Sequence, residues 1–408
     1  MRQFLTGARV AGGSEPAPVP LSFAEVNEDA RGGAILIALV IVLVLGHRWF
    51  AQERGTLIRA VVTRVYEIDP LQDVRWPQFL ERHPKATLFH SPEWLGALQR
   101  TYGYKVGVLT TSSPGECLTN ALAFCRIESW LTGGRLVSVP FSDHCAPLVE
   151  SEEEFGCLVV RLKQECDRGG GRYLEIRSAS GGAGVAAGMA DSATFCLHRL
   201  DLRPSLSELF HALHHSCIRR KIARAQREGV TYEEGTSENL LHKFYQLTVL
   251  TRRRQGILPQ PLSWFRNLIA CMGEGTRIRL ASHEGRPAAA ILTIRYKTTM
   301  TYKYGCSDPR FHRLGPMQLL MWKAIQEAKS GGLLEFDMGR TDWSNEGLLD
   351  YKDRWGATRS TLRYLRHPVP KPHDGTEDVP VRIPLRVFAW APDCFLSTAG
   401  NILYRHIA

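Results

Sequence analysis

The sequence predicts an α/β protein of two tandem lobes, each with mixed sheets flanked by helices. The main observation is a repeated order of elements: strands, an amphipathic helix, a Gly-Gly pair and a strand that contains an acid. "DRGGGRYLEIRS" (residues 167–178) and "AKSGGLLEFDMG" (residues 328–339) share this order. A composition of 44% hydrophobic and 23% charged residues over 408 positions is typical of two or three globular domains. A diverged duplication explains the repeat, and chance similarity of two helix–strand junctions is the alternative.

The elements expected along the chain follow from caps, glycines and hydrophobic periodicity. Ser91 and Pro92 begin a helix that Gly103 ends, and Ser151 begins a second helix. The predicted domains are a leader, a first lobe, a second lobe that includes basic helices at 213–228 and 238–255, and a C-terminal tail. Their bounds are 1–60, 61–200, 201–368 and 369–408. Further helices are expected at 91–103, 151–171 and 315–332. Strands are expected at 172–178, between residues 277 and 305, and at 333–339.

The leader contains a candidate transmembrane segment at residues 32–50. Its uncharged run ends at Gly46 and is shorter than a membrane helix of about 20 residues, but His47 to Phe50 lengthen it. Because arginines follow the run, we expect the body of the protein on the cytoplasmic side, anchored to the inner membrane by this one helix. The alternative is a start codon assigned too far upstream, which leaves a leader without function.

Charge and cysteine content narrow the function classes. The net charge of +10 favours an anionic partner such as a membrane surface, a phosphorylated substrate or RNA. The ten cysteines are scattered without C-x-x-C or Cys/His ligand spacing. This pattern predicts reduced thiols and no metal site.

Two groups of basic residues predict anion binding. Arg220 and Arg224 lie on one face of the first basic helix, where neighbouring guanidinium groups can hold a diphosphate. The helix that begins at Gly315 offers backbone N–H groups, with Arg310 and Arg313 beside them. A solvated helix face and an ordinary strand-to-helix turn are the alternatives.

Four segments carry a family resemblance: "IRRKIARAQREGV", "FYQLTVLTRRRQGILPQP", "YKYGCSDPRFHRLGPMQLLMWKAIQEAKSGGLLEFDMGRT" and "GLLDYKDRWGA". Together they resemble the FemAB-like branch of the GNAT acyltransferase superfamily, and more narrowly its CelD/BioF2-type acetyltransferases. The resemblance covers about residues 62–366 and implies two GNAT-like lobes with substrate in the cleft between them. It implies transfer of an acyl or aminoacyl group from acyl-CoA or aminoacyl-tRNA to an amine of a cell-envelope, peptidoglycan or exopolysaccharide precursor.

The resemblance also implies site residues. Tyr351 and Lys352 match the family's Tyr/Phe-Lys pair, which makes both candidates for catalysis. Attack of an amine on an ester or thioester builds an oxyanion, which a fixed ammonium stabilises by roughly 3 kcal/mol. We expect Asp350 and Asp353 to keep the Lys352 ammonium protonated. The alternative is a surface Lys352 paired with Asp353.

Further candidates precede and accompany this pair. Asp337, in the strand before it, is a candidate for accepting the proton of the acceptor amine or for orienting Arg340. A structural Asp337–Arg340 pair is the alternative. Asp143 and His144 follow a strand of the first lobe and are candidates for contact with substrate in the same cleft, unless they form only a polar loop.

One departure from the GNAT motif weakens the case for acetyl-CoA as the acyl donor. GNAT enzymes bind the CoA pyrophosphate with Q/R-x-x-G-x-G/A, and the matching run here is His312-x-x-Gly315-x-Met317. The expected partners are an anionic small-molecule or lipid-linked precursor, the cytoplasmic membrane surface and tRNA, but not DNA. Two other functions stay open: an inactive GNAT-like scaffold in polysaccharide export and a basic RNA-binding module.

Overall fold

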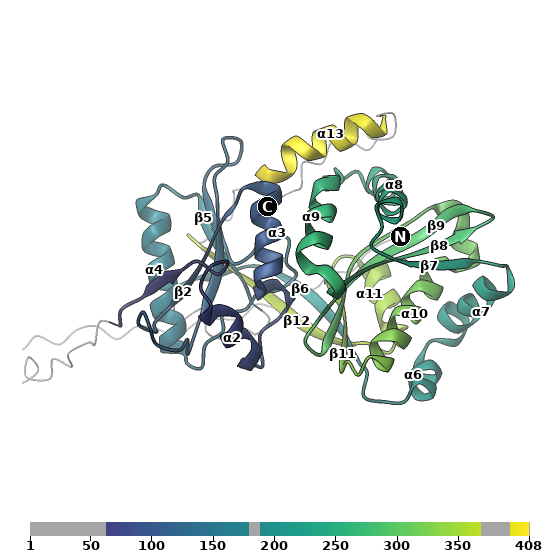
Figure 1. Ribbon diagram of the computed structural model, residues 1–408, viewed down its shortest axis with the longest axis horizontal. Coiled ribbons are helices and arrows are strands. Elements are labelled where there is room, and N and C mark those ends of the chain that lie inside the picture. The colour runs from purple at the N-terminus through teal and green to yellow at the C-terminus, as the bar shows by residue number, and fades with distance from the viewer. Residues whose placement is uncertain (1–62, 179–187, 369–391, 408) are drawn as a thin grey trace, which may run out of the picture. The chain divides into compact units, whose positions relative to one another are not determined.

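The computed structural model describes residues 63–178, 188–368 and 392–407 (Figure 1). Thr63–Ala408 form one compact unit. The described strands form one mixed twelve-stranded sheet. In chain order they are β1 (Tyr66–Ile68), β2 (Lys105–Thr110), β3 (Leu122–Ile127), β4 (Arg135–Val137), β5 (Tyr173–Ser178), β6 (Ala190–Asp201), β7 (Thr231–Gly235), β8 (Thr276–His283), β9 (Arg286–Tyr296), β10 (Thr299–Ser307), β11 (Glu335–Asp342) and β12 (Thr358–His367).

The helices cover both faces of this sheet. They are α2 (Arg75–Arg82), α3 (Pro92–Tyr102), α4 (Glu152–Arg168), α6 (Leu206–Ala212), α7 (Arg220–Arg227), α8 (Glu238–Gln255), α9 (Leu262–Met272), α10 (Pro316–Ser330), α11 (Glu346–Asp353) and α13 (Asp393–Leu403). Shorter helical segments are η3 (Leu88–His90), η4 (His215–Arg219), η5 (Gly273–Gly275), η6 (Pro309–Leu314) and η7 (Tyr404–His406).

The capping signals confirm the predicted helix starts. The Ser91 hydroxyl accepts a hydrogen bond from the Trp94 amide, and Gly103 ends α3 in a left-handed conformation. Ser151 caps α4 in the same way. Serine at the N-cap and glycine after the last turn satisfy backbone groups that the helix itself leaves free, which explains why these bounds were readable. The basic helix expected at 213–228 is instead a π-helical turn, η4, followed by α7.

The two halves of the sheet have the same topology. The strand order is β1-β2-β3-β4-β5-β12-β6-β11-β10-β9-β8-β7. In each half one pair is parallel, β4 with β5 and β10 with β11, and its strands are connected through α4 or α10. A parallel pair needs such a crossover connection. The repeated order in the sequence therefore corresponds to a repeated unit in the fold.

The halves exchange their last strands. β6 follows β5 in the chain but pairs with β11, whereas β12 follows β11 and pairs with β5. β6 and β12 also pair with each other, so the sheet is continuous where separate lobe sheets were expected. β6 thus lies with the second half, although the predicted first lobe runs to residue 200. The domain bounds themselves stay a prediction.

Helices from both halves share one core. In the second half, α8 and α9 cover one face of the sheet and α10 and α7 cover the other (Figure 1). We name these the α9 face and the α10 face. On the α9 face, α3 of the first half packs against α9, with Trp94 and Trp264 edge to face at 5.3 Å. Buried aromatic pairs of this kind add to the energy of area burial.

No helix among the described residues is long and apolar enough to cross a membrane. The candidate segment at residues 32–50 lies outside the described residues.

Candidate functional site

The parallel strands β10 and β11 part in the middle of the second half. They pair only from Thr299 to Thr301 on β10, opposite Glu335 to Asp337 on β11, although both strands continue further. A bulge follows in each strand, in β10 between Tyr302 and Tyr304 and in β11 between Asp337 and Arg340. Bulges bend strands and end regular pairing. They therefore open the sheet at this point.

Gly339 makes the β11 bulge possible. Its φ is +72°, a conformation that L side chains rarely adopt. A Cβ at this position would also lie 3.3 Å from the Asp143 carboxylate. The backbone thus passes close to a charged loop of the first half.

Lys352 reaches the opening from the α10 face. Its helix, α11, is capped by the Asn345 side chain and buries Leu349, and Trp355 follows it as part of the α10-face core. The Lys352 side chain is only 4% exposed. Its ammonium donates to the Gly339 carbonyl at 2.7 Å and, more weakly, to the Arg340 carbonyl at 3.3 Å. The bulge therefore supplies the acceptors that fix this charge.

Burial lowers the pKa of Lys352 to about 8, and the charges of Asp143 and Asp337 oppose this shift. The prediction that Asp350 and Asp353 keep the Lys352 ammonium protonated was wrong. Asp353 binds Arg359 and His198, and Asp350 lies 4.0 Å from Arg354. Helix geometry explains the error, because residues next to Lys352 in sequence point to other faces of α11. The same contacts exclude the surface Lys352–Asp353 pair.

Tyr351 does not share the environment of its neighbour. Its ring packs against the α10-face core and meets the Trp355 ring edge-on at 6.2 Å. Burial raises the pKa of the Tyr351 hydroxyl. The structure thus gives Tyr351 a packing position beside Lys352.

Asp143 approaches the opening from the α9 face. It lies in the loop after β4 and accepts a hydrogen bond from the ammonium of Lys303 at 3.0 Å. Lys303 sits in the β10 bulge, 6% exposed, over the rings of Phe89 (5.0 Å) and Trp94 (5.6 Å). Burial lowers the pKa of Lys303, and Asp143 opposes the shift. Such packing of a cation on aromatic faces offsets part of its lost hydration.

Sequence reasoning missed Lys303. It stands between two tyrosines in the strand "TMTYKYG", and a lone lysine in an aromatic strand was the available signal.

His144 and Asp337 form a buried pair that joins the two halves. His144 Nε2 lies 3.0 Å from Asp337 Oδ2, and the Gly339 amide donates to Asp337 Oδ1 at 2.7 Å. The amide of Cys145 donates to the Arg177 carbonyl of β5 at 2.7 Å, which fixes the loop that carries His144. Burial opposes ionisation of Asp337, but the His144 hydrogen bond and the nearby Arg199 hold its pKa below the usual value.

Arg340 is not the partner of Asp337. Its guanidinium lies 3.8 Å from Asp143 and donates to the Tyr364 hydroxyl at 2.9 Å. It also lies over the Phe195 ring, 4.3 Å from the ring centre. Since β6 supplies Phe195 and β12 supplies Tyr364, the exchanged strands hold Arg340 in place.

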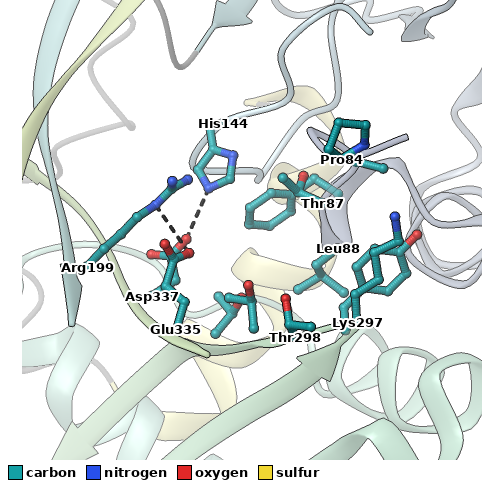
Figure 2. A pocket seen from close by; sticks show the side chains of 14 residues that line it. Pro84, Thr87, Leu88, His144, Arg199, Lys297, Thr298, Glu335 and Asp337 are labelled. Carbon is teal, nitrogen blue, oxygen red and sulfur yellow. Dashed lines mark hydrogen bonds and ion pairs between the residues drawn. The ribbon is translucent and has the colours of Figure 1, made fainter. Parts of the chain in front are cut away.

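A cavity of about 80 Å³ opens beside His144 on the α9 face (Figure 2). Asp337 and Glu335 of β11 point into it, with Arg199 3.5 Å from Glu335. The rest of the lining consists of Pro84, Ala86, Thr87, Leu88, Phe89, Tyr296, Lys297, Thr298, Thr299 and Thr301. Lys352 does not line this cavity.

The predicted anion-binding residues form a second group at the start of α10. Arg220 and Arg224 are exposed on α7, and the Arg224 guanidinium donates to the Arg313 carbonyl at 3.3 Å. Arg310 is exposed but forms a two-pronged pair with Asp308. The structure therefore brings Arg224 to Arg313, whereas Arg310 pairs with Asp308.

The turn at Gly315 is more closed than expected. Its amide donates to the His312 carbonyl, and a Cβ at Gly315 would lie 2.6 Å from the Lys221 carbonyl. α7 therefore covers the turn. Burial lowers the pKa of His312, and the nearby positive charges of Arg254 and Lys221 lower this pKa further.

Comparison with known families identifies the second half. Residues 214–353 match the family described as "Acetyltransferase (GNAT) domain". The chain carries a GNAT acetyltransferase domain. This match confirms the resemblance to FemAB-like GNAT acetyltransferases that the motifs suggested. The match over residues 214–353 indicates a transferase of acyl groups. No curated protein matches the chain.

Solved structures share the fold of the GNAT domain and of the half that precedes it. FemX is 14% identical, with a TM-score of 0.58, and covers 73% of this chain and 96% of its own. L-PGS from Bacillus licheniformis is 14% identical, with a TM-score of 0.50, and the alignment covers 84% of this chain and 100% of L-PGS. A tandem GNAT protein from the clavulanic acid biosynthesis pathway is 13% identical, with a TM-score of 0.51 and coverages of 74% and 97%.

The GNAT domain does not contain the whole site. Lys352, Asp337 and Lys303 fall within the matched residues, whereas Asp143 and His144 come from the half before them. The candidate site is therefore assembled by both halves.

Proposed function

We propose that the protein is an N-acyltransferase in which the Lys352 ammonium stabilises the oxyanion of acyl or aminoacyl transfer to an amine. The observation that carries this proposal is the buried Lys352 Nζ at the opening between β10 and β11, 2.7 Å from the Gly339 carbonyl. An ammonium has three N–H donors, and two of them meet the carbonyls of Gly339 and Arg340. The third is left for substrate.

The chemistry follows from the charge that develops in the reaction. When an amine adds to an ester or thioester, the carbonyl oxygen becomes negative. A fixed donor in a site that excludes water stabilises this charge by roughly 3 kcal/mol, because no solvent has to reorganise. At neutral pH a group with a pKa of about 8 is mostly protonated and can serve as this donor.

The donor we propose carries phosphate, as acyl-CoA and aminoacyl-tRNA do. The basic group at the start of α10 supports this: Lys221 and Arg224 of α7 and Arg254 of α8 lie beside His312 and Arg313. These side chains replace the basic position that the run His312-x-x-Gly315-x-Met317 lacks. Arginine and lysine side chains bind phosphate oxygens strongly.

The acceptor we propose is an amine of an anionic cell-envelope or exopolysaccharide precursor at the cytoplasmic face of the membrane. The net charge of +10 and the FemAB-like resemblance support it.

Lys352→Met tests the role of the ammonium. We expect turnover to fall at least about a hundredfold, because methionine keeps an unbranched side chain as far as Cε and removes the charged ammonium. The assay follows transfer from acetyl-CoA or aminoacyl-tRNA, chosen by a thermal-shift screen of donors. Lys352→Arg is the matched control and should retain part of the activity. Near-normal turnover of a folded Lys352→Met protein would reject the role.

A further inference from the structure

The loop between β3 and β4 presents two large apolar side chains to solvent. Trp130 is 81% exposed and Leu131 is 45% exposed. A single exposed apolar residue is common on a protein surface, whereas several that adjoin one another mark an interaction site. The pair therefore belongs to such a site if further exposed apolar side chains lie beside it.

α13 presents these further apolar side chains. It runs from the end of α8 to the end of α3, and Leu396 on its inner side is buried in the core on the α9 face (Figure 1). Phe395 and Ile402, seven residues apart and so on one face of the helix, are 56% and 57% exposed. A helix that covers a core is normally polar on its outer side. The outer side of α13 is partly apolar instead, which favours contact with another apolar surface.

Hydrogen bonds join the loop and the end of α13 into one surface. The His406 carbonyl accepts from the Thr132 hydroxyl at 2.7 Å and from the Arg135 guanidinium at 2.9 Å. The Trp130 ring meets the His406 ring edge-on at 5.4 Å. Ile402 lies four residues before His406, which is about one helical turn. We name these four exposed side chains the apolar patch: Trp130, Leu131, Phe395 and Ile402.

Two exposed arginines lie beside the apolar patch. Arg405 follows Ile402 by three residues, a spacing that puts both side chains on one side of the helix end. A Cβ at Gly133 would lie 3.7 Å from the Cβ of Arg172, so Arg172 flanks the loop. Neither arginine forms an ion pair with an acid of the described residues. Both charges are therefore available to an anionic partner.

The acids of the same two segments are balanced by other side chains. Glu128, at the start of the loop, lies 2.7 Å from the Lys105 ammonium, and Asp393 of α13 pairs with Arg253. The charge left beside the apolar patch is therefore positive. An anionic surface attracts such a patch, and the net charge of +10 acts in the same direction.

We propose that the apolar patch docks the protein on an anionic lipid bilayer. Tryptophan prefers the boundary between lipid headgroups and chains. Basic side chains beside exposed apolar ones strengthen binding to anionic lipids, whose phosphates Arg172 and Arg405 meet. The inference does not depend on the proposed acyl transfer, because it concerns where the protein binds and no turnover enters its tests.

The first test follows Trp130 in the full chain. The fluorescence of Trp130→Phe is subtracted from that of wild type, which leaves the signal of Trp130. With vesicles of phosphatidylglycerol and phosphatidylcholine, this signal should shift to shorter wavelength, and brominated phosphatidylcholine chains should quench it by at least about half. Insertion of the candidate segment at residues 32–50 does not by itself produce this result, because the signal reports only the surroundings of Trp130.

Trp343→Phe is the matched control for Trp130→Phe. Trp343 is 39% exposed and follows β11, outside the apolar patch. Its difference signal should not be quenched by the same vesicles. An unquenched Trp130, or equal quenching of Trp130 and Trp343, would overturn the proposal.

The second test removes the two charges in Arg172→Gln/Arg405→Gln. The concentration of the anionic vesicles that gives half of the Trp130 quenching should rise at least about fivefold. Arg203→Gln/Arg227→Gln lowers the net charge equally at two exposed arginines elsewhere and should change this concentration less than about twofold. Equal effects of the two double variants would contradict the role of Arg172 and Arg405.

The third test asks whether a second copy of the chain covers the apolar patch instead. Light scattering without lipid should give wild type and Phe395→Ser/Ile402→Ser the same mass. Both side chains are more than half exposed, so the fold should tolerate the change. A dimer that forms in wild type and is lost in this variant would assign the patch to a second copy and overturn the lipid proposal.

Discussion

The ammonium of Lys352 loses hydration because it is buried. Burial moves its pKa from 10.5 to about 8, which corresponds to roughly 3 kcal/mol of folding free energy lost at neutral pH. Strongly shifted pKa values cluster at functional sites. The surrounding carbonyls and carboxylates hold the ammonium in one position, and this fixed position is what oxyanion stabilisation requires.

The pH dependence of stability tests this environment. Between pH 8 and 10.5 the unfolded chain binds a proton at Lys352 that the folded chain does not, so the free energy of unfolding contributed by this residue rises with pH. From about pH 8 to 9.5, wild type should gain roughly 1 to 2 kcal/mol relative to Lys352→Met. Urea unfolding of both proteins at each pH measures the difference, in which other titrating groups cancel. A constant or falling difference would contradict a lowered pKa.

The burial of Lys352 was predictable, but its partners were not. Leu349 and Trp355 beside it in sequence indicate an inward-facing helix, and both are buried. The charges that act on Lys352 come from Asp143 and Asp337, which lie far from it along the chain. Neighbours in sequence suggested Asp350 and Asp353, because nothing local encodes a contact made through a bulge in another strand.

Among the elements, the β11 bulge has the most direct consequence for the site. It turns the carbonyl of Gly339 toward Lys352 and the amide of Gly339 toward Asp337. One glycine thus links Lys352 to the His144–Asp337 pair.

Gly339→Ala should disturb this link. The φ of +72° costs an L residue roughly 1 to 2 kcal/mol, and the new Cβ would crowd the Asp143 carboxylate. We expect a loss of stability of that size and at least a tenfold loss of turnover, measured by urea unfolding and by the transfer assay.

Gly347→Ala is the matched control for Gly339→Ala. Gly347 lies in the first turn of α11, and a Cβ there meets no atom within 4 Å. Because alanine favours the helix, stability should stay the same or rise by up to about 1 kcal/mol. Equal losses of stability and turnover in Gly339→Ala and Gly347→Ala would contradict the role of the β11 bulge.

The bounds of helices with capping residues could be predicted from the sequence, whereas the pairing of the exchanged strands β6 and β12 could not. Ser151 caps α4 and Gly331 follows α10, as expected. β12 shows a period of two, with buried Leu362 and Tyr364 alternating with polar residues, and this pattern was overlooked. Even when a strand is recognised, its alternation does not say which half of the sheet it joins.

At the scale of the whole molecule, the exchange of β6 and β12 makes the halves depend on each other. Each half is completed by a strand that the chain places after the other parallel pair. The shared core of α3 and α9 adds to this dependence. We therefore expect residues 63–408 to unfold as one cooperative unit.

Leu362→Ala probes this coupling. Leu362 is fully buried on β12 opposite Phe195 of β6. The substitution should lower the free energy of unfolding by about 2 to 5 kcal/mol while tryptophan fluorescence and far-ultraviolet circular dichroism still report one coincident transition. Thr361→Ala, at an exposed neighbouring position, should change stability by less than about 0.5 kcal/mol. Two separate transitions would show that the halves fold independently.

The exchanged strands also have a consequence during synthesis on the ribosome. The edge of β5 that pairs with β12 stays unpaired until residues 358–367 have been translated. An open strand edge is a template for wrong pairing with other chains. The nascent first half should therefore depend on chaperones until β12 has been translated, and splitting the gene between the halves would leave two fragments that each need the other's strand.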